Sequence, residues 1–394
     1  MTYQTRRSRG SEPAPKGTYI NFLGSLSEDP FAALDRLGQK PIFWVDDPND
    51  VDGYWVATRF EDVRDIMQDA EAFSSIETHI PLIKLSEPLL PSETDPPYTQ
   101  KLRAVLMPHL TAKKAAALEP RMREVCAAII ESFRAAGRCD VVEQFSRVYP
   151  ITIFIELFGL PSEQKEDFRK QANIFLHDAD RRAEAWMRIR AIVESEIVAK
   201  RASPRDDLLS AIASAQIDGK LLELPIAVGL ASTVFLGGLD TLPSSISWSL
   251  RFLAMHPEYR RQILERPAVI PGAVEELLRL YSVSSPLRRV ARDMDFRGAN
   301  MLAGDRILCS VPSADREVAT FGEKADFKRD NNPHLTFATG PHRCLGSHLA
   351  RHEFAVALEI WHELIPEYRI ADDARIEYSG PVFAIENLPL VWDI

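Results

Sequence analysis

The sequence predicts a mainly α-helical protein with small β-sheets near its two ends. Apolar residues recur at helical spacing in several long stretches, at 99–110, 120–137, 184–202, 224–256 and 272–281. Short runs rich in β-branched and aromatic residues predict strands, at 41–45, 54–58, 296–310 and 376–392. Neither a fixed-period repeat nor a low-complexity tract interrupts the pattern, so a repeat architecture is not expected.

Local signals justify the individual elements in chain order. A turn-rich segment, 46–53, separates the first two strand-like runs and predicts a hairpin, and helical spacing follows at 59–69. The most apolar stretch, 224–239, is too short to span a bilayer comfortably and runs directly into Asp240, so we expect a buried helix. A last helix is predicted just after Gly346, because apolar side chains recur there at helical spacing, at Leu349, Phe354, Val356, Leu358 and Trp361.

Length and composition indicate one soluble domain. The 394 residues contain no evident linker, so we expect a single domain over 18–394, preceded by a polar, proline-bearing tail over 1–17 without regular structure. The net charge of −10 argues against nucleic-acid binding. No apolar run follows the paired arginines near the start, which argues against a signal peptide or membrane anchor. Four scattered cysteines without metal-type spacing favour a reducing cytoplasm.

One cysteine lies in an unusual setting, the stretch FATGPHRCLG from Phe337 to Gly346. Cys344 precedes the predicted helix, where unpaired backbone N–H groups and the positive end of the helix dipole favour a thiolate. Gly340 and Gly346 permit tight turns and the close approach of a flat ligand, while Phe337 can shield the sulfur from water. Taken alone, a cysteine is most often a small buried hydrophobe. A nucleophile activated by His342 or His348 is a further interpretation, but nothing else in the sequence supports hydrolysis.

This ten-residue stretch resembles the haem-binding loop of the cytochrome P450 family. The resemblance implies that Cys344 is the proximal thiolate ligand of haem iron, and that the cofactor is haem b, iron protoporphyrin IX. It also implies a single-domain cytochrome P450 fold with the haem between a long distal helix and the helix after the cysteine loop. Ala338 departs from the family pattern, in which glycine, serine, asparagine or histidine is usual.

Two further motifs appear in the order that the family requires. Glu276 and Arg279 form an ExxR pair whose side chains can meet on one helical turn, although such a pair alone is often a solvated ion pair. The resemblance implies that Arg329 joins them and that the three hold the cysteine segment in place. In the apolar helix, the stretch GGLDT places two glycines before Asp240 and Thr241, which is costly for simple core packing.

The same resemblance assigns the distal chemistry to that stretch. It implies that the helix opens at Gly237 and Gly238, that Thr241 positions a hydrogen-bond network beside dioxygen, and that Asp240 relays protons from solvent. Pro243 lacks an N–H group, so the carbonyl of Leu239 loses its helical partner. This proline therefore favours an opened helix, and a simple kink in a packed helix is an equally weighted alternative.

The family also provides candidates for the haem carboxylates and for the substrate. Arg103, Arg288 and His342 match its propionate partners, because buried carboxylates need such donors. The resemblance is nearest to the camphor-hydroxylating class of soluble bacterial members. It places substrate between the loop after Phe73 and the distal helix, with contacts from His79, Ile80, Leu89, Leu90, Thr233, Leu236, Gly237, Leu242, Ser284 and Val382. These residues are mostly apolar, which implies a small hydrophobic substrate such as a bicyclic monoterpenoid, camphor or cineole-like.

The resemblance further implies a monooxygenase that uses O2 and external electrons. These would come from NADH through a ferredoxin reductase and a 2Fe-2S ferredoxin, with the chain acting as a monomer. The expected docking residues are mainly basic and surround the cysteine loop, with Trp392 adding an apolar contact: Lys101, Arg103, Lys113, Lys114, His342, Arg343 and Arg351. Three alternatives remain: a peroxide-driven haem-thiolate peroxygenase, a non-catalytic haem sensor or carrier, and a plain helical scaffold.

Overall fold

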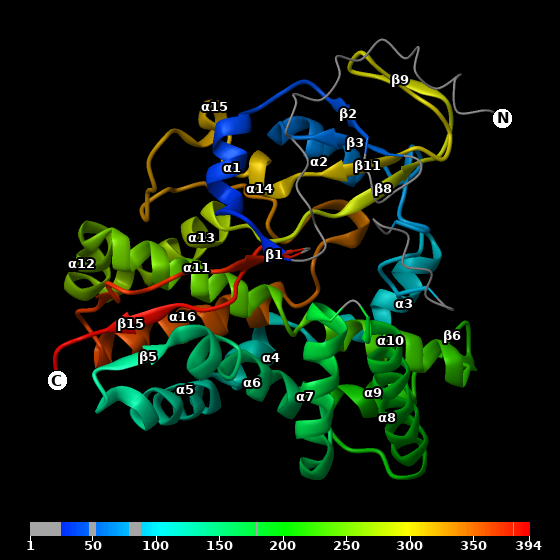
Figure 1. Ribbon diagram of the computed structural model, residues 1–394. Helices are drawn as coiled ribbons and strands as arrows, with labels where there is room; N and C mark the ends of the chain where they lie inside the picture. Colours follow the sequence, from blue (N-terminus) through cyan, green and yellow to red (C-terminus); the bar gives the residue numbers. More distant parts are fainter. Residues whose placement is uncertain (1–24, 47–52, 79–87, 179, 381) are drawn as a thin grey trace.

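The computed structural model describes residues 25–46, 53–78, 88–178, 180–380 and 382–394 (Figure 1). The tail predicted over 1–17 lies outside the described residues, and the single-domain boundary at 18 stays a prediction. Most described residues are helical, and the strands gather in small separate sheets, which confirms the predicted fold class.

The largest sheet joins segments from both halves of the chain. Its strand order is β2 (Phe43–Val45), β3 (Tyr54–Ala57), β11 (Arg306–Cys309), β8 (Leu287–Val290) and β4 (Phe73–Ser74). β2 pairs antiparallel with β3, so the predicted hairpin is confirmed. β11 then runs parallel to β3, with Ile307 opposite Trp55. The helix α2 (Phe60–Gln68) covers this sheet through the buried side chains of Val63 and Ile66.

The smaller sheets connect the chain ends to the helical region. One contains β1 (Ser25–Leu26), β13 (Tyr378–Ser379) and β14 (Ala384–Ile385), and another β12 (Arg369–Ile370), β15 (Pro389–Val391) and β5 (Arg138–Asp140). Two hairpins complete the set, β6 (Gln216–Ile217) with β7 (Lys220–Leu221) and β9 (Met294–Phe296) with β10 (Ala299–Met301).

The helices form the larger part of the molecule: α1, α2, α14 and α15 lie beside the main sheet in Figure 1, and most of the others lie below it. Besides α2, the earlier helices are α1 (Pro30–Leu37), α3 (Tyr98–Leu106), α4 (Ala112–Ala117), α5 (Glu119–Arg134), α6 (Tyr149–Phe158), α7 (Ser162–His177), α8 (Arg182–Ala202) and α9 (Leu208–Ala213). The later ones are α10 (Leu224–Gly237), α11 (Thr241–Met255), α12 (Pro257–Glu265), α13 (Ile270–Leu280), α14 (Val311–Ala314), α15 (Val318–Phe321) and α16 (Ser347–Leu364).

The helix α16 is central to the arrangement because it begins directly after the cysteine loop. It packs against α5, α13 and α4, and its side chains of Phe354 and Trp361 are fully buried. Trp361 lies against Phe133 of α5 and Phe145, so the loop is anchored to the main hydrophobic core. The start of α16 is therefore held by several helices at once.

The predicted long helix over 224–256 is interrupted. α10 ends at Gly237 and α11 begins at Thr241, and between them Leu239 donates its backbone N–H to Leu236 in a shorter, three-residue step. The whole stretch Leu224–Met255 is long and apolar enough to cross a membrane by length and composition, but half of its apolar window is buried inside the protein. Such burial is typical of the core helix of a soluble protein.

Candidate active site

The loop before α16 carries the thiol of Cys344. Cys126, Cys139 and Cys309 are buried, whereas Cys344 is exposed. Many protein atoms nevertheless lie around the sulfur of Cys344. Burial raises the pKa of the thiol, while backbone hydrogen bonds from Gly346 and Ser347 and the charges of Arg103 and Arg351 lower it. The N–H groups are those of the start of α16, as predicted. Burial is the largest of these effects and the pKa of the thiol is raised overall, so the backbone N–H groups and the two arginines only partly offset the cost of a buried thiolate.

Close backbone contacts shape the same loop. Gly340 has a φ of +69°, and a Cβ atom there would lie 2.6 Å from the carbonyl oxygen of Met67. The backbone N–H of Cys344 donates to the carbonyl of Phe337 at 2.8 Å. Ala338 adopts a φ of +53°, a left-handed conformation that favours glycine or asparagine. This conformation agrees with glycine or asparagine being usual at this position in the family and makes alanine the strained choice.

The ExxR pair and Arg329 meet as the resemblance implied. Arg279 donates two hydrogen bonds to Glu276 at 2.9 and 2.7 Å, and Arg329 donates two more at 3.1 and 3.2 Å. Asn332 and the backbone N–H of Asp326 also donate to this carboxylate, each at 2.9 Å. These donors outweigh the cost of burial and lower the pKa of Glu276 to about 2. The network connects α13 to the segment that precedes the cysteine loop.

Three basic residues converge next to the loop. Arg288 on β8 is 5 % exposed, and His342 is half-buried with its Nε2 atom buried and without a hydrogen-bond partner. Arg103 on α3 donates to the carbonyl of Arg343 at 2.5 Å. Burial lowers the pKa of both arginines, and burial together with these two charges lowers that of His342 to about 4.

This arrangement fits the haem that the loop implies. Positive groups that are removed from water repel one another unless an anion compensates them. A haem propionate would supply both the negative charge and an acceptor for the unpaired Nε2 of His342. Arg103, Arg288 and His342 are thus brought together as predicted, beside the Cys344 thiol.

On the opposite side, the interruption between α10 and α11 brings Asp240 and Thr241 to the start of α11. Asp240 is buried at the N-cap position, and the Thr241 hydroxyl donates to the carbonyl of Gly237 over a long 3.5 Å. Gly237 is exposed, and a Cβ atom there would meet nothing within 4 Å. By contrast, a Cβ atom on Gly238 would lie 2.8 Å from the Phe154 ring. The two glycines therefore differ, one facing open space and the other a packed aromatic side chain.

The structure places the predicted substrate residues unevenly. His79 and Ile80 lie outside the described residues. Leu90 is buried with its side chain over Gly229 of α10, and Leu242 is also buried. The other predicted substrate residues are half-buried or exposed: Leu89, Thr233, Leu236, Gly237, Ser284 and Val382. The segments of Ser284 and Val382 are adjacent, since the backbone N–H of Phe383 donates to the carbonyl of Val283 at 2.9 Å.

The predicted docking residues are mostly engaged within the protein. Lys101 pairs with Asp218 at 2.5 Å and Lys114 with Asp206 at 3.7 Å. The charge of Arg351 is paired as well, because its guanidinium donates two hydrogen bonds to Glu275 at 2.5 and 2.9 Å, and its role in docking stays a prediction. Lys113 and Arg343 are exposed.

Trp392 does not belong to this basic region. Its indole N–H donates to the carbonyl of Arg134, and its ring packs near Phe133. Both residues lie at the C-terminal end of α5, a helix of 16 residues and therefore about 24 Å long. Since α4 precedes the other end of α5, Trp392 lies far from Lys113 and Lys114.

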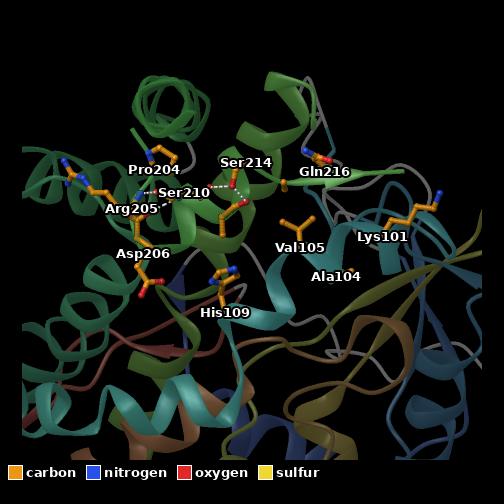
Figure 2. Close-up of a pocket in the computed structure, with 13 residues that line it drawn as sticks. Lys101, Ala104, Val105, His109, Pro204, Arg205, Asp206, Ser210, Ser214 and Gln216 are labelled. Carbon is orange, nitrogen blue, oxygen red and sulfur yellow. Dashed lines mark hydrogen bonds between the residues drawn. The ribbon is translucent and has the colours of Figure 1, made fainter. Parts of the chain in front are cut away.

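A separate cavity of about 440 Å³ lies between α3 and α9 (Figure 2). Val105 and His109 line it from one side, and Ser210 and Ser214 from the other. None of the residues predicted to bind haem or substrate lines this cavity. The cavity is consequently separate from the predicted haem and substrate residues.

Sequence reasoning missed several residues that hold the cysteine loop. Glu275, Asn332 and His334 all join its hydrogen-bond networks, and the buried Asp315 accepts from Ser282, Thr336 and the backbone of Leu335. An available signal was the double glutamate of the ExxR helix, since adjacent acidic residues on a buried helix require separate partners. Arg351, which pairs with Glu275, lies 76 positions further along the chain, so only the tertiary structure identifies this pair.

Comparisons with known proteins agree with this site. The cytochrome P450 family model matches residues 268–361, which include the ExxR helix and the cysteine loop. The chain is 32% identical to a protein named probable cytochrome P450 127A1 from Sinorhizobium fredii, over 98% of this chain and 92% of that protein. It is also 32% identical to the mycinamicin IV hydroxylase/epoxidase of Micromonospora griseorubida, over 86% of this chain and 89% of that enzyme.

Solved structures show the same fold. CYP101J2 superposes with a TM-score of 0.86 at 28% identity, covering 95% of this chain and 96% of that one. Cytochrome P450 CYP101C1 gives 0.85 at 31% identity, covering 93% and 94%. The fold and the thiol site thus define a haem-dependent monooxygenase, which is an oxidoreductase. The chain belongs to the cytochrome P450 family, of bacterial type.

Proposed function

We propose that the protein hydroxylates a small hydrophobic substrate, most simply a bicyclic monoterpenoid such as camphor or a cineole-like ether. Cys344 would be the axial ligand of haem b, and Arg103, Arg288 and His342 would bind its propionates. Phe337, Gly340, Gly346 and Gly238 would shape the space for the flat ring. When bound, haem supplies the redox chemistry that activates O2. The unpaired Nε2 of His342, close to the charges of the buried Arg288 and the half-buried Arg103, is the observation that carries this assignment.

The protein's own residues would govern water and protons at this site. Asp240 and Thr241 begin α11 where α10 stops, so their polar groups interrupt an otherwise apolar surface. Thr241 would hold a hydrogen-bonded proton donor near Gly237, and Asp240 would exchange protons with solvent. Glu276, Arg279 and Arg329 would act structurally, keeping the cysteine segment fixed.

The proposed substrate class rests on the apolar character of the distal residues. Leu90, Leu236, Leu242 and Val382 are aliphatic, and all pack on or within the main core. Binding would therefore come chiefly from buried apolar surface and shape. Relatives of this chain include a protein named vitamin D(3) 25-hydroxylase and the mycinamicin enzyme, so larger substrates belong in any test.

Electrons would come from NADH through a ferredoxin reductase and a 2Fe-2S ferredoxin, with the protein a cytoplasmic monomer. Exposed Lys113 and Arg343 remain the best contacts for an acidic ferredoxin, since α4 packs on α16 near the cysteine loop. Steering by exposed charge weakens with salt. Turnover at limiting ferredoxin should fall as ionic strength rises, and charge reversal at both residues should reproduce that loss.

The central experiment compares the wild-type protein with Cys344→Ser. The wild type should bind one haem per chain and give a strongly red-shifted carbon-monoxide band on reduction, whereas the serine variant should lose that band. A matched control is Cys309→Ser, a buried cysteine on β11 that should leave the band unchanged. A serine variant at 344 that kept the thiolate spectrum would assign the ligand elsewhere.

A titration panel then tests the substrate. Bicyclic monoterpenoids should displace water from the iron and shift its spin state, and a macrolide, a secosteroid and a long fatty acid serve as comparisons. A spin shift only with the larger compounds would overturn the monoterpenoid assignment without affecting the monooxygenase. Turnover with peroxide but not with NADH and a ferredoxin system would favour a peroxygenase.

A further inference from the structure

A second carboxylate lies beside the ExxR glutamate and binds both flanks of the cysteine loop. Glu275 accepts two hydrogen bonds from Arg351, at 2.5 Å from Nε and 2.9 Å from Nη2, and lies 3.0 Å from the Nε2 atom of His334. His334 precedes Cys344 by ten residues and Arg351 follows it by seven. One carboxylate of α13 therefore connects the segments that enter and leave the loop.

The partners of Glu275 also enclose an aromatic ring of the loop. The Arg351 guanidinium lies 4.4 Å from the centre of the Phe337 ring, and the His334 ring lies 6.0 Å from it. Phe337 in turn accepts the backbone N–H of Cys344 at 2.8 Å. A planar guanidinium held by a bidentate carboxylate has little rotational freedom, so it fixes the ring beneath it. Any displacement of Arg351 would thus be passed to Phe337 and to the backbone of Cys344.

The charge of Arg351 acts on two anions. Hydrogen bonds and charge from His334 and Arg351 lower the pKa of Glu275 to about 2 despite its partial burial. The same guanidinium is one of the charges that favour the Cys344 thiolate. Glu275 consequently offsets part of the positive charge that the sulfur would otherwise experience. The pair is 28–30 % exposed, so solvent screens this effect only in part.

We propose that Glu275 and Arg351 are positioning residues that fix Phe337 and set the net charge near the Cys344 sulfur. The inference rests on the proposed function only in taking Cys344 as the haem ligand. Arg351 draws electron density toward itself and makes the sulfur a weaker donor, while Glu275 opposes it. The two residues therefore act with opposite signs on the electron richness of the thiolate, and this differs from what a purely structural ion pair would do.

The midpoint reduction potential of the bound haem tests this directly. Glu275→Gln should raise the potential, because the charge of Arg351 is no longer offset. Arg351→Gln should lower it, because the sulfur becomes a stronger donor. The double variant should return close to wild type. Single variants that shift the potential in the same direction, or that do not shift it, would overturn the electrostatic role.

Arg351→Lys separates charge from position. It keeps the positive charge but loses the planar group that covers Phe337 and the bidentate contact to Glu275. The potential should stay near that of wild type, while the reduced carbon-monoxide complex should lose its red-shifted band several-fold faster in mild urea. An unchanged rate of loss would remove the positioning of Phe337 from the proposal.

A matched ion pair controls for general effects of losing a surface contact. Arg121 and Glu156 join α5 to α6 through two hydrogen bonds at 3.0 and 2.9 Å, away from the loop, with Arg121 more exposed (43 %) than Arg351 (28 %). Arg121→Gln and Glu156→Gln should leave both potential and spectrum unchanged, and a shift equal to that of the Glu275 and Arg351 variants would overturn the inference. Failure of the proposed function would differ, because the wild-type protein itself would then lack the red-shifted band.

Discussion

The two sides of the site are built in different ways. On the side of Cys344, the carboxylates of Glu275 and Glu276 accept hydrogen bonds from four side chains of Arg and His type, from one amide and from one backbone N–H. On the side of Thr241, the hydroxyl of this residue makes a long contact of 3.5 Å to the carbonyl of the exposed Gly237. The difference indicates that the ligand side is fixed by charged networks, whereas the distal side keeps open space and exchangeable polar groups.

The largest effect is expected from Glu276→Gln. The change leaves Arg279, whose side chain is 2 % exposed, next to a neutral amide that cannot replace the carboxylate. Breaking a buried ion pair by removing one partner costs about 3–5 kcal/mol. Thermal unfolding and haem content should both fall strongly. The rigid-loop interpretation would be wrong if the variant held haem and unfolded like the wild type.

Acid should remove the stabilisation that Glu276 provides on the Cys344 side of the site. The pKa of Glu276 is lowered from its usual 4.5 to about 2, so the unfolded protein binds a proton before the folded one does. The stabilisation from this carboxylate is therefore complete above pH 4.5 and disappears as the pH falls toward about 2. Unfolding followed against pH should show this loss in wild type. The loss should be smaller in the Glu276→Gln variant, in which Glu275 still has a pKa lowered to about 2.

Substituting alanine for Gly238 should destabilise the fold, whereas substituting it for Gly237 should not. A Cβ atom at Gly238 would lie 2.8 Å from Phe154, and overpacking of this kind costs about 1–3 kcal/mol. Alanine at Gly237 meets open space and should not destabilise the fold, but its methyl group would occupy room beside Thr241. Urea unfolding of both variants, with spin-state titration of Gly237→Ala, checks the pair. Equal stabilities would contradict the packing difference.

Ala338→Gly should stabilise the cysteine loop slightly. The residue has a φ of +53°, and relieving an L-residue from the left-handed region gains about 1 kcal/mol, less the packing of its methyl group. A small rise in the unfolding midpoint is expected, with an unchanged carbon-monoxide spectrum. Ala350→Gly, within the helix α16, is a control that should instead destabilise.

Thr241→Ala should have the smallest effect on stability and a clear effect on function. The hydroxyl makes only the 3.5 Å contact, so removing it should change the free energy of unfolding by less than about 0.5 kcal/mol. If Thr241 organises proton delivery, the variant should consume NADH at a normal rate but release peroxide in place of hydroxylated product. Asp240→Asn should slow turnover itself. Normal coupling in Thr241→Ala would remove the proton-delivery role.

Much of the architecture followed from patterns along the chain. The hairpin β2–β3, the helices α2, α3, α5, α8, α13 and α16, and the position of Cys344 before α16 agree with local spacing and turn signals. α6 and α7 were not predicted. α6 is apolar on most sides and rich in Ile and Phe, so its sequence lacks the polar face that marks a surface helix.

The sequence by itself identified Cys344 as the candidate ligand, the ExxR pair, and the position at which the distal helix is interrupted. Each of these depends on residues that lie close together in the chain. Tertiary structure alone decided that Glu275 binds Arg351, that Phe154 requires a glycine at 238, and that Trp392 lies away from the basic residues. Such contacts join segments separated by tens of residues or more. Their geometry depends on how helices pack around a shared core, which local spacing does not encode.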